Sequence, residues 1–268
     1  MRRDAPVWRT EDVLYGFYPS LSEVAARRVS KDDGPLDVLV LGGSVVSRHY
    51  IIRELLEQNL SYRLKRRIRI HLLAKPAHTT RDSLLKYRSL GDKHFDVVLV
   101  YHGINDTRAV NCPPEIFKDD YTHYTWYRSL SLIEPYAEAP TGFMLLPYTV
   151  HFIGLQLKEQ LGIGQVVPFH STRKDWLANG DDHTTMRSFH KNLSQILKLA
   201  RERDEKLLLM TFASYIPDDY TLEKFKNKQL DYTTHKRAVE VWGVPEKVQR
   251  RIAAHNAVVR QLAAEHNV

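Results

Sequence analysis

Residues 36–44 read LDVLVLGGS, a nearly continuous apolar run that ends in two glycines and a serine. Such a run, rich in β-branched residues, is typical of a strand that is buried on both faces of a parallel sheet. The segment 50–64 follows it, with apolar residues at the spacing of an amphipathic helix. A buried strand followed by such a helix predicts the first half of a βαβ unit.

The same alternation continues along the chain. Residues 67–73 (RIRIHLL) alternate like a half-buried strand near a sheet edge, whereas 95–101 (FDVVLVY) and 207–212 (LLLMTF) predict two further buried strands. Helical patterns occupy residues 80–90, 185–203 and 245–267, the last opening with a proline in the first turn. Together they predict an α/β fold, a three-layer α/β/α sandwich around a parallel, flavodoxin-like doubly wound sheet.

Two regions fall outside this rhythm. Residues 1–35 form a lead-in segment with an irregular pattern, and residues 111–179 are rich in Tyr, Trp, Pro and His without an obvious strand. Long insertions in compact domains are often lids or binding loops. We therefore expect a single domain over residues 36–268, with the insertion 111–179 lying over its ligand-bearing edge.

Composition bounds the class of protein. The 268 residues are 43% hydrophobic and 26% charged, a globular balance that excludes a disordered, collagenous or coiled-coil chain. The single cysteine, Cys112, excludes an intramolecular disulfide. The net charge of +7 is modest, and the one dense basic run, 63–69, suits a helix C-terminus, so we expect no nucleic-acid partner. The sequence shows neither a signal peptide nor a transmembrane segment, and it names no compartment.

Ser44 is the first candidate for chemistry. Ligands in open parallel sheets bind at the carboxyl ends of strands, and Gly42-Gly43-Ser44 stands at such an end. A hydroxyl there would be exposed beside the unpaired N–H groups of the next helix, which can hold a developing oxyanion. The alternative is a plain serine N-cap. Dinucleotide-binding, P-loop and G-x-S-x-G patterns all fail to match this turn.

Asn105 is the second candidate. It stands in Gly103-Ile104-Asn105-Asp106, directly after the strand predicted at 95–101. An asparagine at such a turn can donate its amide N–H to an oxyanion, while Asp106 would cap the turn or hold the loop. The alternative is an Asx-turn with only a structural role.

Together the two segments resemble the SGNH hydrolases, also known as GDSL-type esterases and lipases. Gly42-Gly43-Ser44 corresponds to that family's first block, and Gly103-Ile104-Asn105-Asp106 to the block that holds its oxyanion asparagine. Ala77 stands where the family has a glycine, and it keeps the backbone N–H that would serve as an oxyanion donor. The resemblance implies a serine hydrolase without a cofactor, in which Ser44 attacks an ester and Ser44, Ala77 and Asn105 stabilise the oxyanion. Gly42, Gly43, Gly103 and Asp106 would support the two loops.

One block of the family is not found. Its D-x-x-H, which supplies the general base, has no counterpart in the expected place, because the chain stops where the family's fifth strand would begin. Three other Asp/His groupings are expected to be structural or substrate-facing: Asp120 with His123, Asp181 and Asp182 with His183, and Asp231 with His235. We expect the base to lie on a C-terminal segment together with the last strand, and the chain as given to be nearly inert.

The remaining features yield weaker expectations. The 13 histidines show no metal-ligand spacing, so no metal site is predicted. Aromatic residues near 121–127 are interpreted as packing, and Arg108 either faces an anionic substrate group or is a plain surface arginine. The favoured substrate is a small-molecule, lipid or acylated-sugar ester. The alternative function is a non-catalytic carbohydrate- or protein-binding domain of the same fold.

Overall fold

A computed structural model of the chain describes residues 10–29, 34–47, 50–91, 93–133, 145–161, 163, 167, 173–180, 182–231 and 237–268. Its centre is a parallel sheet of four strands in the order β2-β1-β3-β4. The strands are β1 (Leu36–Gly42), β2 (Ile68–Leu72), β3 (Val97–Tyr101) and β4 (Lys206–Met210). Each lies within a segment that its apolar pattern predicts, and the outer place of β2 confirms its expected position at a sheet edge.

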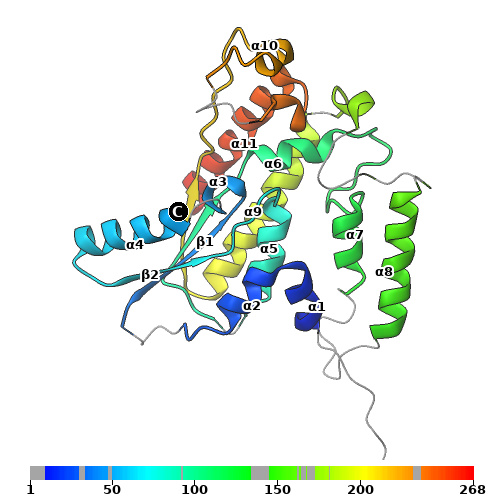
Figure 1. Ribbon diagram of the computed structural model, residues 1–268. Helices are drawn as coiled ribbons and strands as arrows, with labels where there is room; N and C mark the ends of the chain where they lie inside the picture. Colours follow the sequence, from blue (N-terminus) through cyan, green and yellow to red (C-terminus); the bar gives the residue numbers. More distant parts are fainter. Residues whose placement is uncertain are drawn as a thin grey trace, which may run out of the picture.

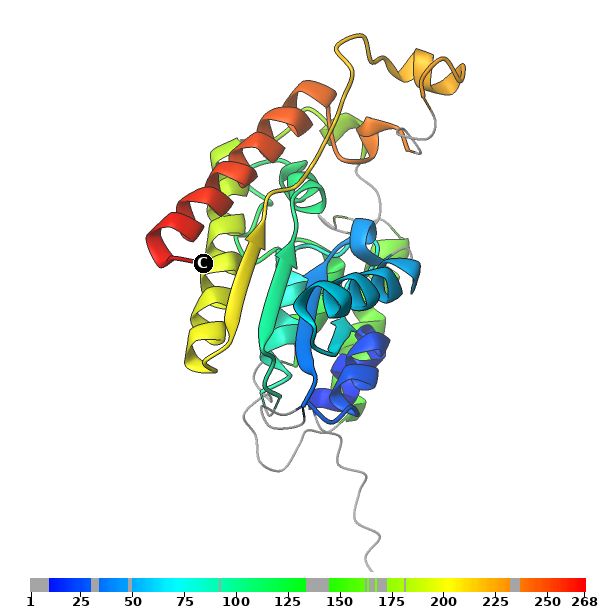
Figure 2. The ribbon, with the colours of Figure 1, turned by 90° about the vertical axis from the view of Figure 1, so that its left-hand side faces the viewer.

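Helices cover both faces of the sheet, which confirms the predicted three-layer α/β/α architecture (Figures 1 and 2). The helix α4 (Tyr50–Leu64) lies on one face, and α5 (Thr80–Arg88), α9 (Asp182–Glu202) and α11 (Pro245–His266) lie on the other. The larger hydrophobic core lies between the sheet and this second layer. It joins the inward side chains of the strands to those of the helices, among them Leu39, Leu41, Val98, Leu84, Phe189, Ile196 and Val259.

The lead-in and the connections contribute short elements. The lead-in was expected to be irregular, but its described part forms α1 (Thr10–Phe17) and α2 (Pro19–Ala25). The turns after β1 and β3 form α3 (Ser44–Ser47) and α6 (Ile104–Thr107), the latter continued by the 3-10 turn η1 (Arg108–Val110). The others are α7 (Thr125–Ser131), α8 (Leu145–Gln160), η3 (Lys174–Trp176), α10 (Leu222–Lys226) and η4 (Val239–Val241).

The predicted burial of the strands is right for β1 and wrong for β3 and β4. All residues of β1 after Leu36 are buried, whereas β3 alternates between buried and half-buried positions. In β4, Leu208 and Met210 are 50% and 44% exposed. The strand lies at the sheet edge, and α9 packs against its opposite face. An apolar run therefore identified the strand, but the placement of neighbouring helices decided its burial.

The described part of the insertion 111–179 lies in two places: residues 111 and 178–179 contact α11 and the turn before it, whereas two of its helices lie elsewhere. Its helices α7 and α8 stand beside α1 (Figure 1), where Phe17 packs edge-to-face against Trp126 at 4.9 Å. Trp126 and Tyr127 also donate hydrogen bonds to the buried carboxylate of Asp82 in α5. Burial of Tyr121, Tyr124 and Tyr127 confirms that this aromatic cluster is packing. Among the described residues, no helix has the length and hydropathy required to span a membrane.

A buried ion pair joins the two strands β1 and β2. Asp37 lies opposite Arg69 in the parallel register, and the guanidinium donates two hydrogen bonds of 2.6 Å to the carboxylate. The Nε2 of His71 lies 2.6 Å from the same carboxylate. Burial alone would raise the pKa of Asp37, but the hydrogen bonds from Arg69 and His71 outweigh it and lower that pKa. The carboxylate therefore stabilises the fold in its charged form.

We expect Asp37→Asn to lower the free energy of unfolding by about 2 kcal/mol near neutral pH, because Arg69 and His71 lose the carboxylate with which they pair. This figure is reduced for the partial exposure of Arg69, which is 32%. Because the folded pKa is depressed, the stabilisation is present above the unfolded pKa of about 3.9 and is lost as pH falls through the folded pKa. Urea unfolding at about pH 7 and about pH 3 measures the difference, and an equal gap between the two proteins at both pH values would contradict it.

Candidate active site

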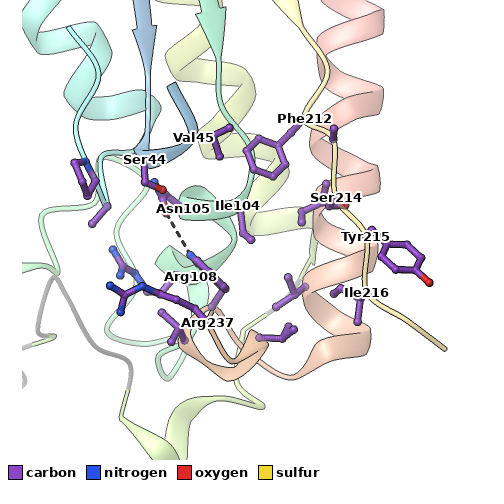
Figure 3. Close-up of a pocket in the computed structure, with 18 residues that line it drawn as sticks. Ser44, Val45, Ile104, Asn105, Arg108, Phe212, Ser214, Tyr215, Ile216 and Arg237 are labelled. Atoms are coloured by element: carbon purple, nitrogen blue, oxygen red, sulfur yellow. Dashed lines mark hydrogen bonds between the residues drawn. The ribbon is translucent and has the colours of Figure 1, made fainter. Parts of the chain in front are cut away.

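A pocket of about 520 Å³ lies at the carboxyl ends of β1, β3 and β4. Ser44 and Asn105, from the turns after β1 and β3, both line it (Figure 3), as does Ala77 from the loop after β2. The turns after neighbouring parallel strands meet at the same edge of the sheet. The structure therefore brings together the three residues that the sequence predicts for an oxyanion site.

Ser44 is the first residue of α3 and is partly buried. Its backbone N–H belongs to the first helical turn, where such groups lack a partner inside the helix. Within the described part of the chain, the Ser44 hydroxyl makes no hydrogen bond, whereas its carbonyl accepts one from the hydroxyl of Ser47 at 3.3 Å. The Ser44 hydroxyl therefore lies at the pocket without a hydrogen-bond partner among the described residues.

The glycines before Ser44 are required by close packing. A Cβ on Gly42 would lie 2.4 Å from the Val46 side chain, and one on Gly43 would lie 2.6 Å from Nδ2 of Asn105. Gly103 likewise would meet Phe212 at 2.5 Å. Neither Gly42 nor Gly43 has a positive φ. Gly43 therefore lets the Asn105 amide approach the backbone before Ser44, and Gly42 lets that backbone pack against Val46.

The amide of Asn105 is held from both ends. Its Nδ2 donates to the backbone carbonyl of His78 at 2.8 Å, and its Oδ1 accepts from the indole Nε1 of Trp242 at 3.3 Å (Figure 3). A primary amide has two N–H donors, so one remains on Nδ2 after the bond to His78. Asn105 is 5% exposed, which fixes this donor in a low-dielectric environment where it would stabilise an oxyanion most strongly.

Ala77 has a φ of 68°, in the left-handed region that favours glycine. It lies in the loop before α5, whose N-terminus is fixed by a capping box between Thr79 and Asp82. The turn thus accepts a methyl group, at a cost of about 1–2 kcal/mol relative to an ordinary conformation. Within the described residues, the Ala77 N–H makes no hydrogen bond, so this donor is available in the pocket.

We expect Ala77→Gly to preserve both folding and any activity of the site, because glycine adopts this conformation without strain. Ala77→Val should lower the free energy of unfolding by roughly 1–3 kcal/mol, since a β-branched side chain is poorly tolerated at positive φ. Thermal unfolding of the two variants measures this difference. Equal stability of the valine and glycine variants would show that the loop does not hold this conformation.

The carboxylate of Asp106 forms hydrogen bonds next to the Asn105 turn. It accepts them from the backbone N–H and hydroxyl of Thr80 and from the hydroxyl of Tyr121. Burial raises the pKa of Asp106 to about 7, although these donors favour the charged form. The side chain is 0% exposed and does not line the pocket. Its contacts tie α6 to the start of α5.

The Asp/His groupings do not supply a base to Ser44 within the described residues. His123 is buried, with one ring nitrogen against the carbonyl of Ala109 at 2.8 Å and the other accepting from the N–H of Lys118. Asp182 pairs with two arginines of α11. Asp181, His235 and the side chain of His183 lie outside the described part. None of the histidines whose side chains are described lines the pocket.

One part of the pocket lining was not predicted from the sequence. It is formed by the segment between β4 and α11, which contributes Phe212, Ile216, Arg237, Val239 and Trp242. The rule that ligands bind at strand ends, applied to β4, would have pointed to Phe212. Among the described residues, no group of three or more His, Cys, Asp or Glu side chains is placed to hold a metal ion.

Comparison with solved structures finds distant likenesses over most of the chain. The chain is similar to an acylhydrolase from Bacteroides fragilis (10% identity, TM-score 0.30, covering 94% of this chain and 96% of that one). It is also similar to a GDSL-like lipase from Bacteroides thetaiotaomicron (13%, 0.29, 92% and 97%) and a lipase/acylhydrolase from Enterococcus faecalis (10%, 0.29, 85% and 96%). Likeness at these levels does not assign an activity. No protein-family model matches the sequence, and no curated protein shows significant similarity to it.

Proposed function

We propose that this protein is a serine esterase of the SGNH type, acting on a carboxylic, lipid or O-acetyl-sugar ester. The observation that supports this most directly is the convergence of Ser44, Ala77 and Asn105 on one pocket, although they follow three different strands. A nucleophilic hydroxyl beside several N–H donors is the arrangement that acyl transfer requires. A helix cap or an Asx-turn alone would not need the three groups to meet.

In this mechanism, the Ser44 oxygen bonds to the acyl carbon while the carbonyl oxygen takes up negative charge. The N–H groups of Ser44 and Ala77 and the Asn105 amide stabilise that charge. The ester C–O bond then breaks, the alcohol leaves with a proton, and water releases the acid from the acyl-serine. A serine hydroxyl is a weak nucleophile without a base. We propose that a histidine outside the described residues takes its proton.

A fluorophosphonate probe tests this function because it reacts covalently with activated serines. We expect labelling of Ser44, located by mass spectrometry, and stronger labelling in any longer product of the reading frame that adds a D-x-x-H segment after Val268. Labelling at other residues only, in either protein, would overturn the esterase assignment.

The alternative is a non-catalytic carbohydrate- or protein-binding domain of the same fold. The observation that favours it is the absence of a described histidine at the Ser44 hydroxyl. Such a domain would bind its ligand in the same pocket with Ser44 as a simple helix start. A protein that binds acylated ligands but never labels at Ser44 would support this alternative.

A further inference from the structure

The indole ring of Trp242 contacts Asn105 from a distant part of the sequence. Trp242 follows η4, in the connection between β4 and α11, and it lines the same pocket as Ser44. Its Nε1 donates a hydrogen bond of 3.3 Å to Oδ1 of Asn105, which is the dashed line in Figure 3. The two residues are 137 positions apart in the sequence. The contact is therefore a product of the tertiary fold and not of a local turn.

The two hydrogen bonds of the Asn105 amide determine which way it faces. One end of a primary amide only accepts hydrogen bonds, and the other end only donates them. The carbonyl of His78, 2.8 Å from Nδ2, only accepts, and the indole N–H of Trp242 only donates. An amide turned by half a rotation would set oxygen against oxygen and N–H against N–H. His78 and Trp242 together thus select the orientation that leaves the second N–H of Nδ2 for the pocket.

The bond to His78 alone would not fix this orientation. The torsion that turns an asparagine amide is broad, without the deep wells of an ordinary side-chain torsion. With one contact at Nδ2, the amide could swing about that point and carry its second N–H away from the pocket. The contact from Trp242 at Oδ1 supplies the second point that defines the amide plane. An oxyanion donor stabilises the transition state most when it is in place before the charge develops.

Trp242 is held in turn by a buried network of hydrogen bonds. Its backbone carbonyl accepts from Nδ2 of Asn111 at 2.6 Å, and Oδ1 of Asn111 accepts from Arg251 at 2.6 Å. Arg251 is fully buried and also donates to the carboxylate of Asp182. Gly243, the next residue, has a φ of 142°, and a Cβ there would lie 3.1 Å from Nδ2 of Asn111. The backbone of Trp242 is therefore anchored to both α9 and α11.

We infer that Trp242 is a positioning residue, whose indole N–H holds the Asn105 amide in the orientation that an oxyanion requires. This inference rests on the proposed function and adds a residue to its machinery. The effect of Trp242 on the reaction passes through Asn105. Because the indole ring also forms part of the pocket wall, a test must remove the N–H and keep an aromatic ring. Trp242→Phe makes this change.

The kinetics of fluorophosphonate labelling at Ser44 test this role, because the phosphonyl oxygen takes the place of the oxyanion. We expect Trp242→Phe to lower the maximal labelling rate roughly three- to tenfold, the worth of one neutral hydrogen bond. The probe concentration that gives half of that rate should change little, whereas a residue that only forms the wall would raise it. In an Asn105→Ala background the same substitution should have no further effect. Trp176→Phe is the matched control that should keep the wild-type rate, since this indole packs against Arg173 and does not line the pocket.

A second measurement reports on the contact without any labelling reaction. In protein with isotope-labelled tryptophan, the NMR signal of the Trp242 indole N–H is assigned by its loss in Trp242→Phe. We expect the hydrogen exchange of this N–H to be faster in Asn105→Ala than in the wild type, and unchanged in Ser44→Ala.

Three results would overturn the inference: a labelling rate that Trp242→Phe leaves unchanged, an equal drop in the wild-type and Asn105→Ala backgrounds, or indole exchange that does not depend on Asn105. A wild-type protein that never labels at Ser44, while indole exchange still depends on Asn105, would overturn the esterase function and leave the positioning contact standing.

Discussion

In a form of the protein that carries the general base, replacing Ser44 by alanine should abolish fluorophosphonate labelling and lower ester hydrolysis by roughly 10³-fold or more, as loss of the nucleophile does in serine hydrolases. The reason is that the acyl group has no oxygen to which it can be transferred once the hydroxyl is gone. The fold should be unaffected, because the hydroxyl makes no hydrogen bond within the described residues. Hydrolysis of a chromogenic ester, with thermal unfolding measured in parallel, gives both quantities.

Ser47→Ala is the matched control for this substitution. Ser47 lies at the other end of α3, and its hydroxyl donates only to the carbonyl of Ser44 at 3.3 Å. We expect its hydrolysis and labelling to stay near the wild-type level. Hydrolysis that is undiminished in Ser44→Ala would mean that another residue carries the chemistry.

The second large effect is expected for Asn105→Ala, which should lower kcat by roughly 10²- to 10³-fold with little change in KM. The amide would act on charge that develops only in the transition state, so its removal affects the chemical step more than substrate binding. Asn59→Ala on the exposed side of α4 is the control, because among the described residues its amide donates only to the carbonyl of Leu55.

Asn105 also has a structural role that must be separated from the catalytic one. Its amide bridges the His78 carbonyl and the Trp242 indole, so we expect Asn105→Ala to lower the free energy of unfolding by about 1–3 kcal/mol. Rates are therefore compared at a temperature where both proteins are folded. A variant that retains wild-type kcat while folded would exclude Asn105 from the oxyanion site.

The sequence was sufficient to predict the positions of the strands but not their burial. LDVLVL in β1 and LLLMTF around β4 look alike as apolar runs, yet β1 is buried and Leu208 of β4 is 50% exposed. A local run of apolar residues indicates that a segment is an extended strand. Its burial depends on which helices return to that part of the sheet, which is a property of the whole chain.

The residues of the candidate site also fall into two groups, those that the sequence predicts and those that it does not. Ser44 and Asn105 follow strands directly, so their meeting could be predicted from the rule that parallel strands end at one edge. Trp242 and Arg237 come from a long connection with no regular pattern, and nothing local indicates that they return to the same pocket. The insertion 111–179 is predicted there instead, but of its described residues Trp126 packs against Phe17 of α1, and Tyr127 donates to Asp82 of α5.

A crystal structure of the protein after reaction with a fluorophosphonate tests the central claim most directly. We expect phosphorus bonded to the Ser44 oxygen, with the phosphonyl oxygen within about 2.7–3.1 Å of Nδ2 of Asn105 and the N–H groups of Ser44 and Ala77. An adduct on Ser44 whose phosphonyl oxygen points away from Asn105 and Ala77 would contradict the account, as would an adduct on any other residue.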